Sequence, residues 1–210
     1  MLLYDNPNAP NPRRVRMFLV EKGVEIPTRT VDLRSGEHFS DDFRAVNPGC
    51  TVPALVLDDG TAIAESVAIC QYLEAVYPDP PLMGEGAAGR ALVTMWQRRM
   101  EHDGFFAVVE AFRNAAPGLR GRALPGGREV EQIPELAERG RRRYGWFLED
   151  LDRRLQETSF VAGEDFSIAD ITALVTVDFA RRAIKVEPPA GLGALDRWYR
   201  EVSARPSAGA

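Results

Sequence analysis

The stretch NPGCTVPAL, residues 47–55, joins a Pro/Gly turn to the start of a short apolar strand. Proline is tolerated at the first residue of a strand, because its missing N–H breaks no ladder hydrogen bond there. Pro53 also holds Val52 extended. An extended residue beside a loop presents its N–H and C=O outward, the geometry that pairs with another peptide backbone. The stretch therefore predicts a peptide-like ligand at Val52. A cis Val52–Pro53 bond, a form taken by about 5% of X–Pro bonds, would sharpen this presentation, and an ordinary loop-to-strand turn is the alternative.

The residues after this stretch predict a hairpin that leads into a helix. Short strands over 54–57 and 61–64 flank the turn signal Asp59-Gly60, and Glu65-Ser66 opens a helical pattern. A helix N-terminus favours a carboxylate, and the Ser66 hydroxyl adds a donor. Glu65 can accept a hydrogen bond from an ammonium group, so the pair suits the α-carboxylate and α-amine of an amino acid. The alternative for Ser66 is a plain N-cap.

The residues before this stretch predict a strand, a helix and a second strand. Residues 1–4 form the first strand, and the second covers 26–33. Between them, Asn11 is a suitable N-cap and Pro12 a suitable first helical residue of a helix that ends at Gly23. The two strands are expected to be parallel through a right-handed crossover.

Three arginines of this helix, Arg13, Arg14 and Arg16, mostly lie off its apolar stripe. We expect solvated or interface charges there.

Residues 78–89, PDPPLMGEGAAG, form a Pro/Gly-rich linker and the clearest domain boundary. Gly84, Gly86 and Gly89 match the dinucleotide pattern G-x-G-x-x-G. That pattern requires a strand immediately before it, and the residues here are Pro80-Pro81-Leu82-Met83, so we expect no dinucleotide site.

From residue 91 onward the periodicity is helical, and it predicts either one long helix or a pair of helices with a break near Gly104. Ser167 is expected to cap a later helix in a capping box with Asp170.

The amino-acid composition argues against several classes of function. With 45% hydrophobic residues, the 210-residue chain can build a substantial core, and a net charge of −5 argues against general nucleic-acid binding. No run is long and apolar enough to span a membrane, and the N-terminus does not resemble a signal peptide, so the cytoplasm is expected. Two cysteines without a C-x-x-C pair and two histidines predict neither a redox centre nor a metal site.

The combination of Asn47-Pro48, Val52-Pro53-Ala54-Leu55 and Glu65-Ser66 resembles the glutathione-binding half of the cytosolic glutathione transferases. The resemblance extends over nearly the whole chain, because the sequence FSIAD at 166–170 is typical of that family's second domain. It implies an α+β thioredoxin-like domain over 1–77, with the order strand-helix-strand-helix-strand-strand-helix. A linker over 78–89 and an all-helical domain over 90–210 would follow.

The resemblance also implies the roles of individual residues. Val52, next to a cis Pro53, would pair with the backbone of the glutathione cysteine, and Thr51 adjoins this contact. Glu65 and Ser66 would hold the γ-glutamyl end. The loop Gly36-Glu37-His38 resembles one in which a histidine contacts the glycine carboxylate, although Phe39 stands where a lysine often follows. An exposed histidine without a role is the alternative reading of His38.

The sequence departs from the better-known classes at the residue that activates the thiol. Counted back from Gly23, the usual serine falls at Ala9 and the usual cysteine at Asn11, and Tyr4 lies near the tyrosine of a third group. The stretch NPNAPNPRRVR resembles an atypical yeast and bacterial type without these residues, in which a water held by second-domain side chains is thought to assist; Arg113 and Asn114 lie in that region. We expect the thiolate at the helix terminus, with the Asn11 amide or nearby N–H groups as donors. A plain N-cap is the alternative for Asn11.

The expected function is conjugation of glutathione, as co-substrate, to a hydrophobic electrophile lying between the domains against Phe105 and Arg113. No metal, nucleic acid or membrane is expected to take part, and family resemblance implies a homodimer. Two alternatives stay open: a glutathione-dependent isomerase, dehalogenase or ether-cleaving enzyme, and a binding module without turnover.

Overall fold

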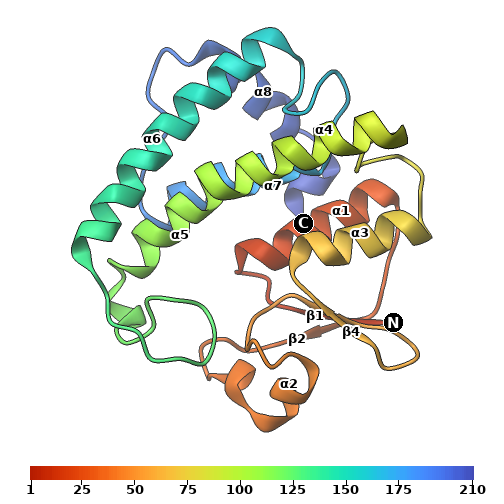
Figure 1. Cartoon of the computed structure of the whole chain (residues 1–210), viewed down its shortest axis with the longest axis vertical. Helices are drawn as coiled ribbons and strands as arrows, with labels where there is room; N and C mark the ends of the chain where they lie inside the picture. The colour runs from red at the N-terminus through yellow and green to blue at the C-terminus, as the bar shows by residue number, and fades with distance from the viewer. The chain divides into compact units, whose positions relative to one another are not determined.

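The structure, a computed structural model, describes residues 1–210 and divides into two compact units. The first unit contains residues 1–80, Pro125–Arg128 and Gly209–Ala210, and the second contains Pro81–Leu124 and Glu129–Ala208. Figure 1 shows the strands in residues 1–80 and the helices of the later residues.

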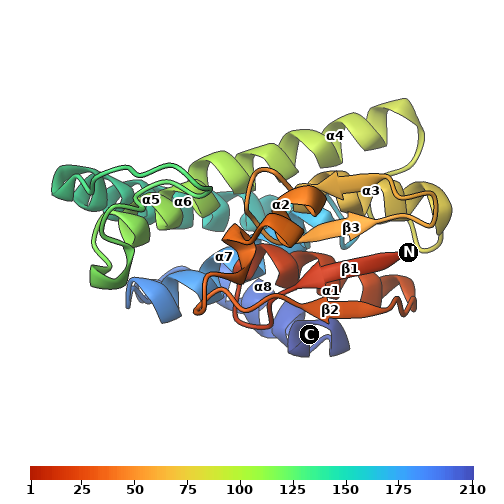
Figure 2. The ribbon, with the colours of Figure 1, turned by 90° about the horizontal axis from the view of Figure 1, so that it is seen from below.

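The first unit is built on a four-stranded sheet with the order β2-β1-β3-β4. Strand β1 (Leu2–Asp5) pairs in parallel with β2 (Thr28–Thr30) and antiparallel with β3 (Ala54–Val56), which pairs antiparallel with β4 (Ala62–Ala64). Helices α1 (Pro10–Lys22) and α3 (Ser66–Val76) lie on one face of the sheet, and α2 (Asp41–Val46) lies on the other (Figures 1 and 2). The predicted thioredoxin-like order is confirmed, with an additional 3-10 turn at Glu37–Phe39.

Strand β2 is shorter than the predicted strand over 26–33. Pro27 has no N–H to donate, so the ladder begins after it, and only its carbonyl contributes by accepting from Leu3 N at 2.9 Å. At the other end, the Asp32 carboxylate accepts from the backbone N–H of Arg34 and turns the chain away. Proline and a local side-chain turn therefore limit this edge strand.

Helix α1 begins earlier than predicted, which corrects the assignment of Asn11 as N-cap. Ala9 occupies the cap position and provides no capping side chain, while Asn11 is the second residue of the helix. The C-terminal end is as expected, because Gly23 has φ 65° and closes the helix.

Of the three arginines expected to be solvated or interface charges, Arg14 is not solvated, because it is 2% exposed. Arg16 is partly exposed and forms an ion pair with Asp5 at 2.6 Å.

The second unit is helical, as predicted. It contains α4 (Gly86–Arg99), a π-helical segment (Met100–Phe105), α5 (Phe106–Arg113), α6 (Pro134–Glu157), α7 (Ile168–Ala183) and α8 (Gly193–Ser203). Helix α4 begins inside the stretch predicted as linker. The predicted break near Gly104 is the π-helical segment, where an added Cβ would lie 2.6 Å from the Phe147 ring.

The G-x-G-x-x-G match is not preceded by a strand, which confirms the prediction. The element before it is α3, and Gly84 and Gly89 lie in and just after the turn that starts α4.

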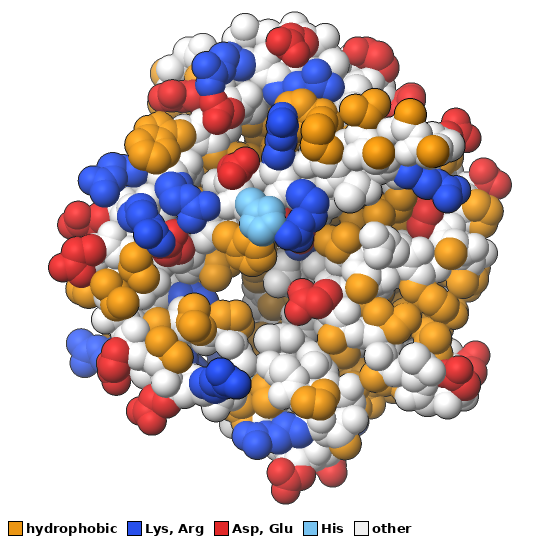
Figure 3. All heavy atoms as spheres, viewed as in Figure 1, with side chains coloured by type: hydrophobic (Ala, Val, Ile, Leu, Met, Phe, Trp, Pro, Cys, Tyr) orange, Lys and Arg blue, Asp and Glu red, His pale blue; other side chains and the backbone are white.

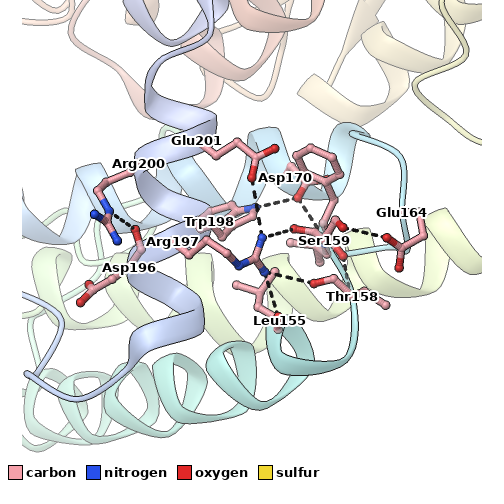
Figure 4. Close-up of polar contacts among 12 residues, drawn as sticks. Leu155, Thr158, Ser159, Glu164, Asp170, Asp196, Arg197, Trp198, Arg200 and Glu201 are labelled. Atoms are coloured by element: carbon pink, nitrogen blue, oxygen red, sulfur yellow. Dashed lines mark hydrogen bonds and ion pairs between the residues drawn. The ribbon is translucent and has the colours of Figure 1, made fainter.

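The capping box at the start of α7 is also confirmed, and it organises the interior of the second unit. Ser167 accepts from Ala169 N, and the fully buried Asp170 accepts from the backbone N–H of Ser167 at 3.0 Å. The other Asp170 oxygen accepts from the indole N–H of Trp198 and from Val161 N, each at 2.9 Å (Figure 4). One carboxylate thus joins α7, α8 and the loop that precedes α7.

None of the helices has the length and apolar character needed to cross a membrane. On the face drawn in Figure 3, basic and acidic side chains are mixed, with hydrophobic side chains between them.

Candidate active site

Strand register brings three segments to one end of the sheet. Ala54 pairs with Ala64 in the hairpin and with Tyr4 in β1. Pro53 therefore enters β3 at the end where β4 leaves toward Glu65. The chain also leaves β1 at this end, after Asp5, on its way to α1. Residues far apart in the sequence thus meet at one edge of the sheet.

Val52 lies in this edge with its main-chain groups unused. The Val52–Pro53 peptide bond is cis, and the Val52 side chain packs with Val31 and Phe43. Neither the N–H nor the C=O of Val52 makes a hydrogen bond, because the ladder with β1 begins at Ala54. Extended backbone with both groups free can accept a peptide strand.

The turn before Val52 is shaped by Asn47, whose role the sequence analysis missed. Its Nδ2 donates to the carbonyl and the hydroxyl oxygen of Thr51, at 2.8 and 3.1 Å, and its Oδ1 accepts from Gly49 N at 3.0 Å. An Asn followed by Pro-Gly is a known turn signal, so the pattern could have indicated this role. The Thr51 hydroxyl, predicted to adjoin the ligand, therefore also supports the turn.

Glu65 and Ser66 form the start of α3. Glu65 is the cap residue and has φ 72°, a conformation that is uncommon for a residue with a side chain. Its carboxylate is exposed and makes no ion pair within the protein. Ser66 is the first helical residue, and its hydroxyl makes no hydrogen bond that would cap the helix. The plain N-cap alternative for Ser66 is therefore excluded, and its hydroxyl is available next to free helix N–H groups.

The start of α1 offers one residue with two donors. Pro10 and Pro12 have no N–H, so Asn11 supplies the unpaired backbone donor of the first three positions. The Asn11 Oδ1 accepts from Arg14 Nη1 at 3.2 Å, and because arginine only donates, the carboxamide NH₂ is the end left to donate. Ala9, which precedes these residues, packs against the cluster that contains Val52.

Tyr4 and His38 also lie in the first unit. The Tyr4 side chain packs on the Val52 cluster, with its ring centroid 5.9 Å from that of Phe43. His38 is on the 3-10 turn, and its ring lies 3.8 Å from that of Phe39. Phe39, which stands where a lysine was expected, therefore packs beside the histidine.

Phe105 and Arg113, the predicted electrophile residues, lie in the second unit. Phe105 is 3% exposed, and its ring lies 5.9 Å from that of Phe179 and 6.0 Å from that of Phe106. The Arg113 guanidinium donates to the carbonyls of Arg122 and Leu124, each at 2.6 Å, and to that of Ala123 at 3.3 Å. Burial lowers the pKa of Arg113.

Comparison with known proteins agrees with this geometry. Residues 9–76 match the sequence model of the glutathione S-transferase N-terminal domain, and residues 134–201 match that of the C-terminal domain. The chain belongs to the glutathione S-transferase family. Glutathione S-transferase 2 of Saccharomyces cerevisiae is 37% identical over 99% of this chain and 87% of its own length.

Solved glutathione S-transferase structures share the fold over the full length. A glutathione S-transferase domain-containing protein from Marinobacter aquaeolei superposes with a TM-score of 0.92 at 40% identity, covering 99% of both chains. Gtt2 from Saccharomyces cerevisiae gives 0.91 at 36% identity, covering 100% of this chain and 99% of its own. The chain is therefore a transferase that resembles the yeast and bacterial type, as its sequence predicted.

Proposed function

We propose that this transferase binds glutathione along Val52 and conjugates its thiolate to a hydrophobic electrophile. The observation that carries the proposal is the free N–H and C=O of Val52 beside the cis Pro53. The glutathione cysteine would pair with these groups as an added strand. The γ-glutamyl carboxylate would lie at the Ser66 helix terminus, and its amine near Glu65. His38 would contact the glycine carboxylate, and Thr51 would border the cysteine.

The enzyme has to make the glutathione thiol acidic. A thiol with a pKa near 8.5 needs a shift of about two units to be mostly ionised at pH 7, which corresponds to about 2.7 kcal/mol. A helix dipole contributes about 0.3 to 1 kcal/mol, and a hydrogen bond to a charged group about 1.5 to 3 kcal/mol. The helix dipole alone does not reach this value, so at least one aimed donor is necessary. We propose Asn11 as that donor, since its backbone N–H and its carboxamide NH₂ are both free.

The role of Asn11 is tested by titrating bound glutathione through the ultraviolet absorbance of the thiolate. We expect Asn11→Ala to raise the pKa of the bound thiol by about one unit, the shift that corresponds to one lost hydrogen bond to a charged group. Asn8→Ala is the matched control, because Asn8 lies exposed in the loop before α1. An unchanged thiol pKa in Asn11→Ala would remove Asn11 from the site.

Binding and turnover are tested separately. We expect retention of the protein on a glutathione column and conjugation of an activated aryl halide. Retention without turnover of that substrate, or of isomerase, dehalogenase and ether substrates, would favour a binding module. Failure to bind glutathione would contradict every reading that uses it.

We further propose that the electrophile contacts the helical domain near Phe105 and Arg113. The aromatic group of Phe105, Phe106 and Phe179 supports this placement, because apolar aromatic surface suits a hydrophobic substrate. Phe106 is 44% exposed, so part of the group reaches the surface.

A homodimer is proposed from the family. The exposed side chains of Leu92 and Met95, one turn apart on α4, support an apolar contact. Light scattering at micromolar concentration is expected to give twice the mass of the chain.

A further inference from the structure

The loop between α5 and α6 has its base in the second unit and its tip in the first. Residues Pro125–Arg128, which we call the tip, group with residues 1–80, whereas the residues on both sides of the tip belong to the helical unit. Figure 1 shows this loop in green. Neither the proposed ligand contacts nor the thiol donor uses it.

The base of this loop is closed by hydrogen bonds in its own unit. Arg113 donates to three successive carbonyls, those of Arg122, Ala123 and Leu124. The backbone adds Ala123 N to Val130 O at 3.0 Å and Val130 N to Gly121 O at 2.8 Å. The Arg113 contacts end at Leu124, the residue immediately before the tip. The base therefore fixes the point at which the tip begins.

Two further side chains join the two ends of the loop. Gln132 Nε2 donates to the carbonyls of Arg113 and Ala116, at 2.7 and 2.8 Å. Asn114 Oδ1 accepts from Ile133 N at 2.9 Å. A loop closed in this way has little freedom at its ends.

The tip packs on the turn that precedes Val52, and the backbone conformation of Gly126 favours glycine there. A Cβ on Gly126 would lie 3.4 Å from Gly49 O, and Gly126 has φ 98°, a conformation that L side chains rarely adopt. A Cβ on Gly127 would lie 3.7 Å from Cys50 Sγ. The tip backbone thus lies directly against Gly49 and Cys50.

The turn under the tip is itself in an uncommon conformation. Cys50 has φ 53° and is 4% exposed, and it is two residues from Val52. A residue with a side chain keeps such a backbone only when its surroundings hold it. Asn47 holds this turn from one side through Thr51 and Gly49, and the tip lies against its Gly49 and Cys50.

We propose that the glycine tip holds the Gly49–Cys50 turn so that Val52 is preformed for the glutathione backbone. The inference rests on the proposed function. The tip residues are positioning residues, because they act on the ligand through the turn. Loss of the tip contact is expected to weaken glutathione binding, since the ligand would then have to order the turn. The rate at saturating glutathione should change much less.

The first experiment measures the tip contact without any ligand. The alkylation rates of Cys50 and Cys70 with iodoacetamide are compared by peptide mass spectrometry. We expect Gly126→Ala to raise the rate at Cys50 about tenfold, the effect of about 1.4 kcal/mol of backbone strain. Cys70, which is 1% exposed in α3, is the internal control and should be unchanged. An unchanged rate at Cys50 would overturn the proposal, and so would an equal rise at Cys70, which would mean that the loop stabilises the fold as a whole.

The second experiment measures glutathione. For Gly126→Ala we expect a dissociation constant and a KM for glutathione about five- to tenfold higher than in the wild type, with kcat at saturating glutathione within about twofold. Gly118→Ala is the matched control in the same loop, because its φ is not positive and an added Cβ meets nothing within 4 Å. Equal glutathione constants in Gly126→Ala and Gly118→Ala would overturn the proposal. If the wild type itself does not bind glutathione, the proposed function fails, and the alkylation rates still decide whether the tip covers the turn.

Discussion

At the scale of single residues, two serines at helix starts serve different purposes. Ser66 is the first residue of α3 and makes no capping hydrogen bond, whereas Ser167 is the N-cap of α7 within a full capping box. Both are buried, with exposed fractions of 4% and 3%. Similar burial therefore accompanies a proposed ligand contact in one case and a structural contact in the other.

The two serines predict opposite outcomes on substitution. Ser66→Ala should weaken glutathione binding about tenfold, because a hydrogen bond to a charged carboxylate is lost, and should leave the free energy of unfolding nearly unchanged. Ser167→Ala should lower the free energy of unfolding by about 1 kcal/mol, the usual loss of a helix cap, with unchanged glutathione affinity. Calorimetric binding and urea unfolding of both variants provide the check. A loss of stability in Ser66→Ala with intact binding would reverse the assignment.

At the scale of elements, α6 carries two glycines with different surroundings. A Cβ on Gly140 would lie 2.6 Å from Ala107 O and 2.7 Å from Ala111 N, both in the backbone of α5. A Cβ on Gly145 would meet nothing within 4 Å. Gly140 therefore permits the close approach of the two helices, while Gly145 has no packing reason to be glycine.

This difference makes the pair a matched test of helix packing. Gly140→Ala should destabilise the protein by about 2 to 3 kcal/mol, because backbone atoms of α5 have to move apart from the new methyl group. Gly145→Ala should stabilise it by about 0.5 to 1 kcal/mol, the intrinsic helix preference of alanine over glycine. Urea unfolding midpoints measure both effects. Equal shifts in the two variants would contradict the close-packing argument.

At the scale of the whole molecule, the buried Asp170 connects stability to pH. Burial raises the pKa of Asp170 to about 6, although its hydrogen bonds from Val161, Trp198 and Ser167 oppose this shift. In the unfolded chain the carboxyl titrates near its ordinary value of 3.8. Between these two values the folded protein binds more protons at this site than the unfolded chain. The contribution of Asp170 to the free energy of unfolding is therefore complete below about pH 4 and is lost as the pH rises through about 6.

The pH dependence is tested by comparison with Asp170→Asn, which does not titrate. We expect the variant to be less stable than the wild type, because an amide NH₂ cannot accept the hydrogen bonds that the carboxylate accepts. The difference in the free energy of unfolding between the wild type and the variant, here called the gap, should narrow by up to about 3 kcal/mol between about pH 4 and about pH 7. Each pKa unit corresponds to about 1.4 kcal/mol. Unfolding in urea at several pH values measures the gap. A gap that stays constant or widens with pH would contradict the raised pKa.

Local patterns in the sequence determined the order of elements in the first unit. Prolines, glycines and helix caps act over a few residues, so the Pro53 turn, the Asp59-Gly60 hairpin and the Ser167 capping box were predictable. Strand register alone decided that Val52 and Glu65 lie at one edge, because register depends on pairing between distant residues.

Features that depend on contacts far along the chain were decided by the tertiary structure. The N-cap of α1 is Ala9 and not the predicted Asn11, and Arg14 is buried. The glycines at 126 and 127 lie against the Gly49–Cys50 turn. Each of these outcomes depends on which atoms of other segments fill the surrounding space. Sequence spacing within one segment carries no record of those neighbours.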